Sequence, residues 1–306
     1  MNVTVWEERF AEYLELCGRS PATIRAYRFE LRRFLGFLVD RGVQGVHEIT
    51  KDELEAYQVR LHRRRRPDGR PITAGTRNAR LSAVLSFLGF LTEGHYLLVN
   101  PGRDVRRPRV PRRILPQLPD EEQVENLLVA PDTTNPLGLR DRAMLELLYS
   151  SALRNRELRM LAVEDVDLAR LWVRVLHGKG DKQRMVPLGE PAAAWIEEYL
   201  RRGRGFLVTD EGTSRLFLSL RGEPLSGEAL SDIVRRHAGA AGLPMRVTPH
   251  ILRHACATHM LARQARLRHL QVLLGHDSPN ATQRYTQVQL DDLREVHQRC
   301  HPREAL

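Results

Sequence analysis

The sequence has few cysteines, no long apolar run and no recognisable targeting segment. Its three cysteines, Cys17, Cys256 and Cys300, form no CxxC pair, which argues against a disulfide framework and against a cysteine-based zinc site. The longest apolar stretches, such as 81–91, are interrupted and too short to span a bilayer. No basic-then-apolar signal opens the chain. We therefore expect a cytoplasmic protein with no membrane partner.

The sequence also lacks a Walker phosphate-binding motif and a cluster of acidic residues at metal-ligand spacing. We therefore expect neither a cofactor nor a bound metal. What the chain has is arginine, and its distribution is uneven. Residues 60–113 hold 14 arginines against three acidic residues, a net charge of +11, whereas 1–59 and 114–306 sum to −2 and +1. Such a block predicts a polyanionic partner, most simply nucleic acid; a solvated basic face is the alternative.

The first hundred residues have helical periodicity only. Ser20-Pro21 is a helix start followed by apolar residues at helical spacing, Thr50 to Glu53 has the pattern of a capping box, and a further helix is predicted over 76–91. Proline and arginine then alternate without apolar periodicity. We predict a helical domain over 1–102, a basic linker over 103–116 and a second domain over 117–306.

The remainder of the chain mixes helical and strand-like patterns. Apolar runs at 171–176 and 184–188 predict two strands joined by a glycine-containing hairpin turn, and 216–220 predicts a third strand. The predicted fold is mainly α, with a small β-sheet in an α+β second domain, and the two domains are expected to form a clamp. Helices are predicted over 121–128, 139–150, 156–162, 228–238, 249–263 and 267–274.

One of these helices carries the string HILRH after the start signal Thr248-Pro249. Positions i, i+3 and i+4 share a helix face, so His250, Arg253 and His254 present a guanidinium between two imidazoles. Two histidines at this spacing are also typical of zinc sites, but a zincin would have Glu where Ile251 stands. A solvated polar face is the other alternative.

The HILRH string is more informative when it is considered together with residues before and after it in the chain. Arg154 opens a helix upstream, Lys179 lies in the hairpin turn, and His276 and Tyr285 follow nine residues apart. In this order of Arg, Lys, His-x-x-Arg, His and Tyr, the sequence resembles the tyrosine recombinase (phage integrase) family. The resemblance covers essentially the whole chain. It implies a helical core-binding domain of the SAM-like type and a catalytic domain that cuts and rejoins DNA at a specific site.

The resemblance also implies a role for each matching residue. Tyr285 corresponds to the nucleophile, Arg154 and Arg253 to the arginines that clamp the scissile phosphate, Lys179 to the hairpin lysine, and His250 and His276 to the two histidines. The chemistry agrees, because paired guanidinium hydrogen bonds suit a phosphorane-like state and a phosphotyrosyl link conserves bond energy without ATP. Simpler alternatives are a surface ion pair of Arg154 with Glu157 and a solvated turn at Lys179.

Two details narrow or qualify the resemblance. Ala152 stands where the family usually has glycine. The C-terminal segment with Leu290, Leu293 and Val296 is similar to the tail of the Xer recombinases, which resolve chromosome dimers during cell division. That similarity implies a helix that docks into a neighbouring protomer of a homo- or heterotetramer on DNA. The alternative is a helix packed on its own domain.

Other functional readings stay open at this point. Within the class, the chain fits an integrase or transposase of a mobile element. From a different class, the alternatives are a DNA binder without catalysis and an enzyme like type IB topoisomerase. Base readout needs side chains at base edges, and Arg77, Asn78 and Arg80 are the candidates in the core-binding domain.

Overall fold

A computed structural model describes residues 3–110, 117–176, 183–209, 212–275 and 287–304, with side chains from 290 in the last range. The chain divides into two compact units, Met1–Leu115 and Pro116–Leu306. Each has a hydrophobic core of its own. The limits 1–102, 103–116 and 117–306 stay a prediction. No helix in the described ranges has the length and apolarity needed to cross a membrane.

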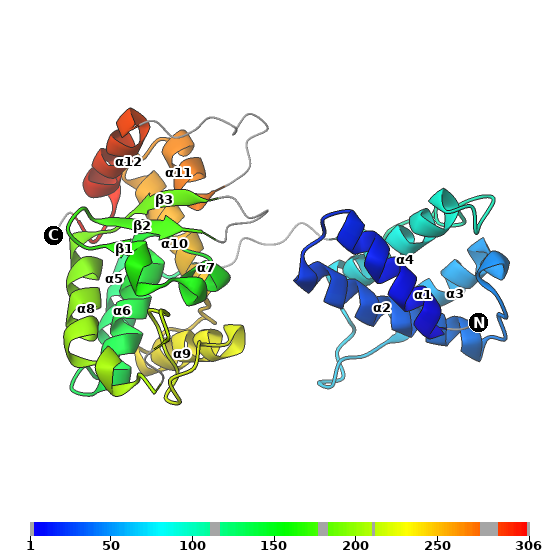
Figure 1. Ribbon diagram of the computed structural model, residues 1–306, viewed down its shortest axis with the longest axis horizontal. Helices are drawn as coiled ribbons and strands as arrows, with labels where there is room; N and C mark the ends of the chain where they lie inside the picture. Colours follow the sequence, from blue (N-terminus) through cyan, green and yellow to red (C-terminus); the bar gives the residue numbers. More distant parts are fainter. Residues whose placement is uncertain (1–2, 111–116, 177–182, 210–211, 276–286, 305–306) are drawn as a thin grey trace. The chain divides into compact units, whose positions relative to one another are not determined.

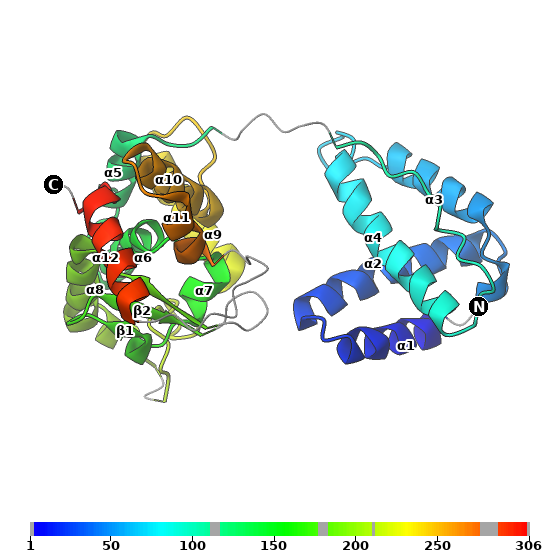
Figure 2. The same cartoon turned by 90° about the horizontal axis from the view of Figure 1, so that it is seen from above.

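The first unit is helical. It consists of α1 (Val3–Leu16), α2 (Pro21–Asp40), the 3-10 turn η1 (Val46–Glu48), α3 (Lys51–Arg63) and α4 (Ala74–Glu93). Helix α2 packs against both α1 and α4 (Figures 1 and 2). Fully buried residues such as Phe10, Phe34 and Phe87 form the core, and burying a side chain of this size contributes about 1.5–3 kcal/mol.

Two helix starts in this unit differ in how they are capped. Ser20 accepts a hydrogen bond from the backbone N–H of Thr23 at 3.2 Å, as the Ser-Pro signal predicted. The capping box predicted at Thr50 is wrong, because the Thr50 side chain makes no cap hydrogen bond. Glu53 instead pairs with Arg41 at 2.6 Å, so a tertiary contact takes the side chain that the box would need.

The second unit surrounds one nearly encased helix, α6 (Pro136–Ser150), in which every residue from Gly138 to Ser150 is buried. Its charged residues are paired: Asp141, for example, binds Arg140, Arg236 and His237. The other helical elements are α5 (Glu121–Val129), α7 (Asn155–Met160), η2 (Val163–Asp165), α8 (Glu190–Arg202), η3 (Arg204–Phe206), α9 (Gly227–Ala240), α10 (Pro249–Ala262), α11 (Leu267–Leu274) and α12 (Gln287–Cys300).

A three-stranded antiparallel sheet lies in the second unit, with the order β1-β2-β3. The strands are β1 (Val166–Asp167), β2 (Trp172–Val175) and β3 (Arg184–Pro187), and Val173 pairs with Val186. The predicted strands at 171–176 and 184–188 are confirmed, as is the mainly helical fold with one small sheet. The predicted hairpin turn at 177–182 lies outside the described residues.

Candidate active site

Arg154 lies at the start of α7, directly before its first residue. The chain reaches this position through Ala152, which is fully buried and has a left-handed backbone with φ of 48°. An alanine in this conformation costs about 1–2 kcal/mol more than a glycine would. The glycine usual in the family therefore suits the backbone, and this chain holds an alanine under strain at the same turn.

The strained residue makes a contact that the site uses. The carbonyl oxygen of Ala152 accepts a hydrogen bond from Nη1 of Arg253, which comes from α10. Arg253 is 4% exposed, and burial and the charge of Arg154 lower its pKa to about 10, so it is cationic at neutral pH. The turn at Ala152 thus links the two arginines predicted to bind phosphate.

Glu157 gathers three arginines around one buried carboxylate. Its Oε1 accepts from Arg154 Nη1 at 2.7 Å, and both its oxygens accept from Arg184 of β3 at 2.7 and 2.9 Å. Arg253 Nη1 lies 3.8 Å from Oε2. Burial by itself would raise the pKa of Glu157, but the hydrogen bonds and charge of Arg184 and the bonds from Arg154 lower it to about 2.

The predicted pair of Arg154 with Glu157 therefore exists, but it is not a surface pair. The Glu157 side chain is 1% exposed, whereas that of Arg154 is 31% exposed. The buried Glu157 carboxylate orients the Arg154 guanidinium, part of which remains exposed to solvent. An arginine held in this way is already oriented to donate hydrogen bonds to a ligand oxygen.

A single backbone oxygen joins Arg154 and Arg253. The carbonyl of Leu274, the last residue of α11, accepts from Nη2 of Arg154 at 3.0 Å and also from Nη2 of Arg253. Arg154 Nη2 also donates to the carbonyl of Gly275 at 3.1 Å. Because the C-terminal carbonyls of a helix carry partial negative charge, they hold the two guanidinium groups together.

Gly275 ends α11 in the left-handed conformation, with φ of 57°. A Cβ at this position would lie 3.1–3.2 Å from the guanidinium end of Arg184. Glycine is therefore favoured on two grounds, the left-handed backbone angle and the close approach of Arg184. His276 is the next residue in the chain.

His250 is exposed at the first turn of α10, and its ring makes an edge-to-face contact with that of His254 at 4.8 Å. Partial burial, together with His254 and the charges of Arg253 and Arg154, lowers the pKa of His250 below its usual value. Its imidazole is therefore neutral at neutral pH and able to accept a proton. Thr248 caps the helix as predicted.

The described residues hold three of the six predicted catalytic side chains, Arg154, His250 and Arg253. Lys179, His276 and Tyr285 lie outside the described residues. No sequence pattern predicts a role for Arg184, and Glu157 is predicted only as a surface partner of Arg154. The available signal was a Glu three residues after Arg154, but its burial and its bond to a strand 27 residues away depend on tertiary structure.

The three candidates for base readout all make contacts inside the first unit. Arg77 Nη1 lies 2.6 Å from Nδ1 of His62, Asn78 Nδ2 donates to the carbonyl of Pro108 at 2.9 Å, and Arg80 lies 3.5 Å from Glu30. Asn78 thus holds part of the predicted linker against α4. Contact of these side chains with bases stays a prediction.

The C-terminal helix α12 packs on its own unit, beside β3, α10 and α11 (Figure 1). Leu293 and Val296 are 1% and 4% exposed. This burial agrees with the alternative given above, a helix packed on its own domain. His297 and His301 are buried, stack on each other, and lie 2.8 and 3.2 Å from the carbonyls of Ser150 and Tyr149.

Comparison with known proteins matches both units. The model described as "Phage integrase family" matches residues 118–291, and that described as "Phage integrase, N-terminal SAM-like domain" matches residues 8–95. The chain belongs to the phage integrase family. The predicted enzyme class is confirmed with it: a tyrosine recombinase, which cleaves and rejoins DNA strands.

Relatives within the family span almost the whole chain. It is 39% identical over 300 residues to tyrosine recombinase XerC 2 of Ralstonia nicotianae, covering 98% of this chain and 86% of the relative. It is 38% identical to tyrosine recombinase XerD of Pseudomonas aeruginosa over 298 residues, 97% of each chain. The predicted similarity to the Xer recombinases is therefore confirmed.

Solved structures show the same fold at lower identity. XerH recombinase in a post-cleavage complex with a palindromic difH substrate has a TM-score of 0.66 at 20% identity, covering 88% of this chain and 78% of that one. A lambda integrase tetramer bound to a Holliday junction has a TM-score of 0.64 at 20% identity, covering 92% and 80%.

Proposed function

We propose that this phage-integrase family member recombines DNA at specific sites through a 3′-phosphotyrosyl intermediate on Tyr285. The tyrosine oxygen attacks the scissile phosphorus, the P–O bond to the 5′ oxygen breaks, and a proton is delivered to that leaving oxygen. Rejoining reverses the same step, with the 5′ hydroxyl of a new strand as the nucleophile. The number of phosphodiester-type bonds is unchanged throughout, so no ATP is needed.

The observation that carries the proposal is the pairing of Arg154 and Arg253 through the carbonyl of Leu274. Two guanidinium groups fixed side by side suit the non-bridging oxygens of a phosphate whose negative charge rises in the transition state. In this proposal His250 accepts the Tyr285 proton, Lys179 protonates the leaving oxygen and His276 binds the phosphate. The lowered pKa of His250 supports its role as the base.

The relatives favour an Xer-type role, which is the resolution of chromosome or plasmid dimers. The protein would act as a homo- or heterotetramer on DNA in the cytoplasm. A tetramer is supported by the fold shared with the lambda integrase assembly. Integration or transposition of a mobile element is the second role compatible with the same chemistry.

Suicide DNA substrates, nicked beside candidate sites, test the chemistry directly. Wild type is expected to form a denaturation-resistant DNA adduct, and Tyr285→Phe to bind the same DNA without forming one. Arg154→Lys should be severely impaired in adduct formation, because the charge remains but the paired hydrogen bonds are lost.

The site that reacts then tells the chromosomal role from the mobile-element role. Relaxation of supercoiled plasmid without any recognition site would favour a topoisomerase-like activity. Intact binding with no adduct on any substrate would favour a DNA binder without catalysis.

A further inference from the structure

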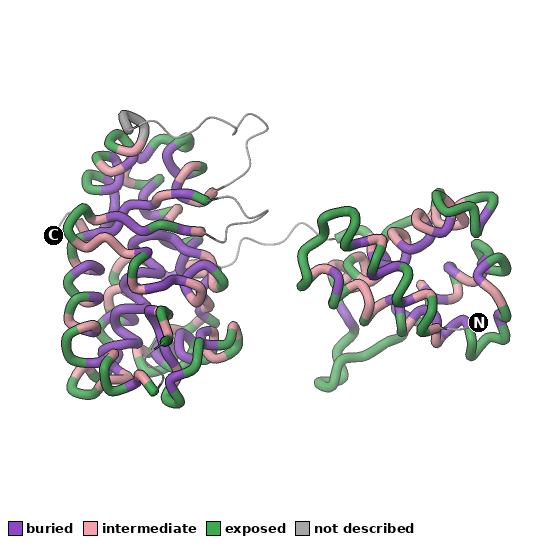
Figure 3. Tube along the Cα trace, in the orientation of Figure 1, coloured by how far each residue is buried: buried purple, intermediate pink, exposed green. Residues whose placement is uncertain are grey.

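Arg63, the last residue of α3, and the segment that follows it up to Ile72 form a basic hairpin, here called the arginine hairpin and defined as residues 63–72. In Figure 1 it extends away from the helices of the first unit, and in Figure 3 it is coloured as exposed. Residues 62–71 are all exposed. It carries five arginines, at positions 63, 64, 65, 66 and 70, and a single acidic residue, Asp68.

Backbone hydrogen bonds give the arginine hairpin a defined shape. The Arg66 N–H donates to the Arg70 carbonyl at 2.8 Å, the Gly69 N–H donates to the Arg66 carbonyl at 2.9 Å, and Arg65 bridges to Pro71. Gly69 has φ of 75°, which suits a turn closed by a glycine bulge. Ile72 is 7% exposed and anchors the base in the core.

The charge of the arginine hairpin is poorly neutralised by its own protein. Within the described ranges, no carboxylate lies at ion-pair distance from Arg63, Arg65 or Arg70. Asp68 lies 3.5 Å from Arg66 and accepts from the Arg70 N–H. Like charges held this close repel one another, and a polyanion would relieve the repulsion.

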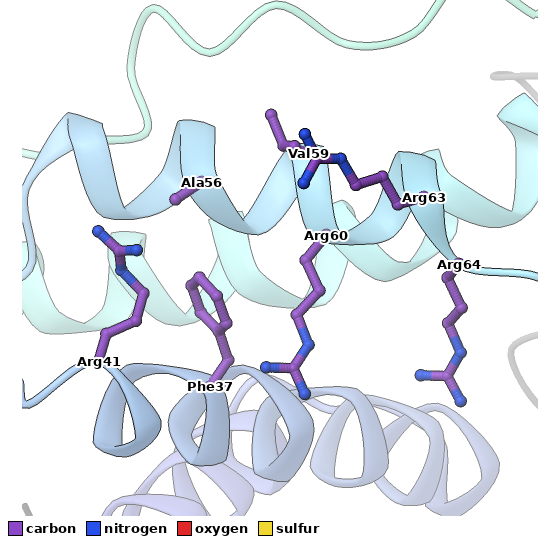
Figure 4. A pocket seen from close by; sticks show the side chains of 7 residues that line it. All are labelled: Phe37, Arg41, Ala56, Val59, Arg60, Arg63 and Arg64. Carbon is purple, nitrogen blue, oxygen red and sulfur yellow. The ribbon is translucent and has the colours of Figure 1, made fainter.

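The neighbouring groove between α2 and α3 makes an informative contrast. Figure 4 shows Arg41 and Arg60 on either side of the Phe37 ring, and their guanidinium carbons lie 5.7 and 5.3 Å from its centre. Both arginines have acidic partners: Arg41 pairs with Glu53 at 2.6 Å and Arg60 with Asp40 at 3.4 Å. These two arginines support the packing of α2 on α3. Arg63 and Arg64 of the arginine hairpin also line this groove, but the ion pairs of the described residues include neither of them.

We propose that the arginine hairpin binds the phosphate backbone of duplex DNA and extends the DNA contact of the first unit without reading sequence. The inference rests on the proposed function, which makes DNA the substrate. Side chains on an exposed two-stranded ribbon reach phosphates on the outside of a duplex, and such contacts add affinity but carry no sequence information. The hairpin runs directly into α4, the helix that carries Arg77, Asn78 and Arg80.

The test compares two triple variants of the full chain that remove the same charge. The hairpin variant is Arg63→Gln, Arg65→Gln and Arg70→Gln, which leaves the hairpin backbone bonds intact. The control is Arg170→Gln, Arg201→Gln and Arg202→Gln, three exposed arginines of the second unit that lie near Asp167 or Glu198. Each triple variant lowers the net charge of +10 by three.

Binding is measured against salt concentration on a random-sequence duplex and on a duplex that contains the reactive site. Each phosphate contact contributes about 0.9 to the slope of log K against log salt, so the hairpin variant should lose roughly 2–3 from the slope. The control should lose less than about 1. The loss should be equal on both duplexes.

Three results would overturn the inference. An unchanged slope for the hairpin variant, with wild type still binding duplex, would refute the arginine hairpin but leave the recombinase standing. Weakening confined to the duplex with the reactive site would show base readout instead. Stronger competition by single-stranded RNA than by duplex DNA would point to another nucleic acid. Failure of wild type to bind any duplex would refute the proposed function itself.

Discussion

At the scale of single residues, Glu157 determines how the positive charge of the site is arranged. It is the buried carboxylate nearest to Arg154, Arg184 and Arg253, and it bonds to two of them directly. Removing one partner of a buried charged group leaves the other without compensation, and this is among the most destabilising of single changes.

Glu157→Gln is therefore expected to lower the free energy of unfolding at pH 7 by about 3–5 kcal/mol. The effect should depend on pH. The pKa of Glu157 is about 2 in the folded protein against 4.5 ordinarily, so its stabilising charge is fully present above pH 4.5 and is lost as the pH falls towards 2. Urea unfolding of wild type and variant at pH 7 and pH 3 measures the difference, which should narrow at pH 3.

Glu198→Gln provides the control, since Glu198 pairs with Arg201 and Arg202 at the surface. Exposed pairs contribute little, so this variant should match wild type at both pH values. A Glu157→Gln deficit that stayed constant between pH 7 and pH 3 would contradict the role assigned to its charge.

Gly275→Ala should weaken the end of α11. The new methyl group would meet Arg184 at 3.1–3.2 Å, and the left-handed backbone disfavours alanine, so the free energy of unfolding should fall by about 1–2 kcal/mol. Adduct formation on a suicide substrate should fall as well, because Arg154 and Arg253 bind the carbonyls at this turn.

Gly239→Ala in α9 is the matched change, because a Cβ there meets open space in a helix. It should leave stability equal or raise it by up to about 1 kcal/mol. Equal losses in the two variants would show that the turn at Gly275 has no special requirement.

Residue order in the sequence predicts candidate site residues, but it does not predict the contacts that surround them. Arg154 and Arg253 were recognisable because residue order is preserved in the chain. The shared Leu274 carbonyl was not, since a backbone oxygen has no sequence signature. The bond from Asn78 to the Pro108 carbonyl has no sequence signature either, and contact of Asn78 with bases stays a prediction.

At the scale of elements, local patterns predicted most helices and two of the three strands. Helix α8 (Glu190–Arg202) was not predicted. The predicted strand at 216–220 is wrong, because only isolated bridges occur there. The Leu218 carbonyl accepts a hydrogen bond from the Arg140 guanidinium, and the carbonyl of Arg215, directly before this segment, accepts one from Arg204. Arginine side chains thus take the place of a partner strand. An apolar run predicts that the segment is buried, but it does not predict which groups form hydrogen bonds with its backbone.

Helix α12 is attached to its unit by histidines that must remain uncharged. Burial lowers the pKa of His297 from 6.5 to about 4 and also lowers the pKa of His301 well below its usual value. Unfolded chains bind the proton first, so the stability from this packing is complete above pH 6.5 and is lost as the pH falls towards 4. The loss amounts to roughly 3 kcal/mol for a shift of this size.

His297→Gln should flatten the pH dependence of unfolding between pH 6.5 and 4.5, because one titrating group is gone. Urea titrations across this range measure the slope, and the comparison of slopes is unaffected by a constant loss of stability. His47→Gln, at a mostly exposed histidine, should leave the slope as it is in wild type. Equal slopes for wild type and His297→Gln would contradict the packing argument.

At the scale of the whole molecule, the two hydrophobic cores share no residue. Fragments 1–110 and 117–306 are therefore each expected to unfold cooperatively on their own, with midpoints close to those of the full chain. A fragment 1–72, which lacks α4 and its buried face, should stay unfolded. Calorimetry of the three fragments measures this, and folding of 1–110 only in the presence of 117–306 would contradict it.

The left-handed turn at Ala152 has a consequence for natural variation of this sequence. A fully buried site with positive φ favours small side chains, so alanine and glycine are the residues expected at this position. Sequences with alanine at position 152 retain backbone strain next to Arg154. A change to glycine at position 152 would remove this strain, and related sequences are therefore expected to carry mainly one of these two residues there.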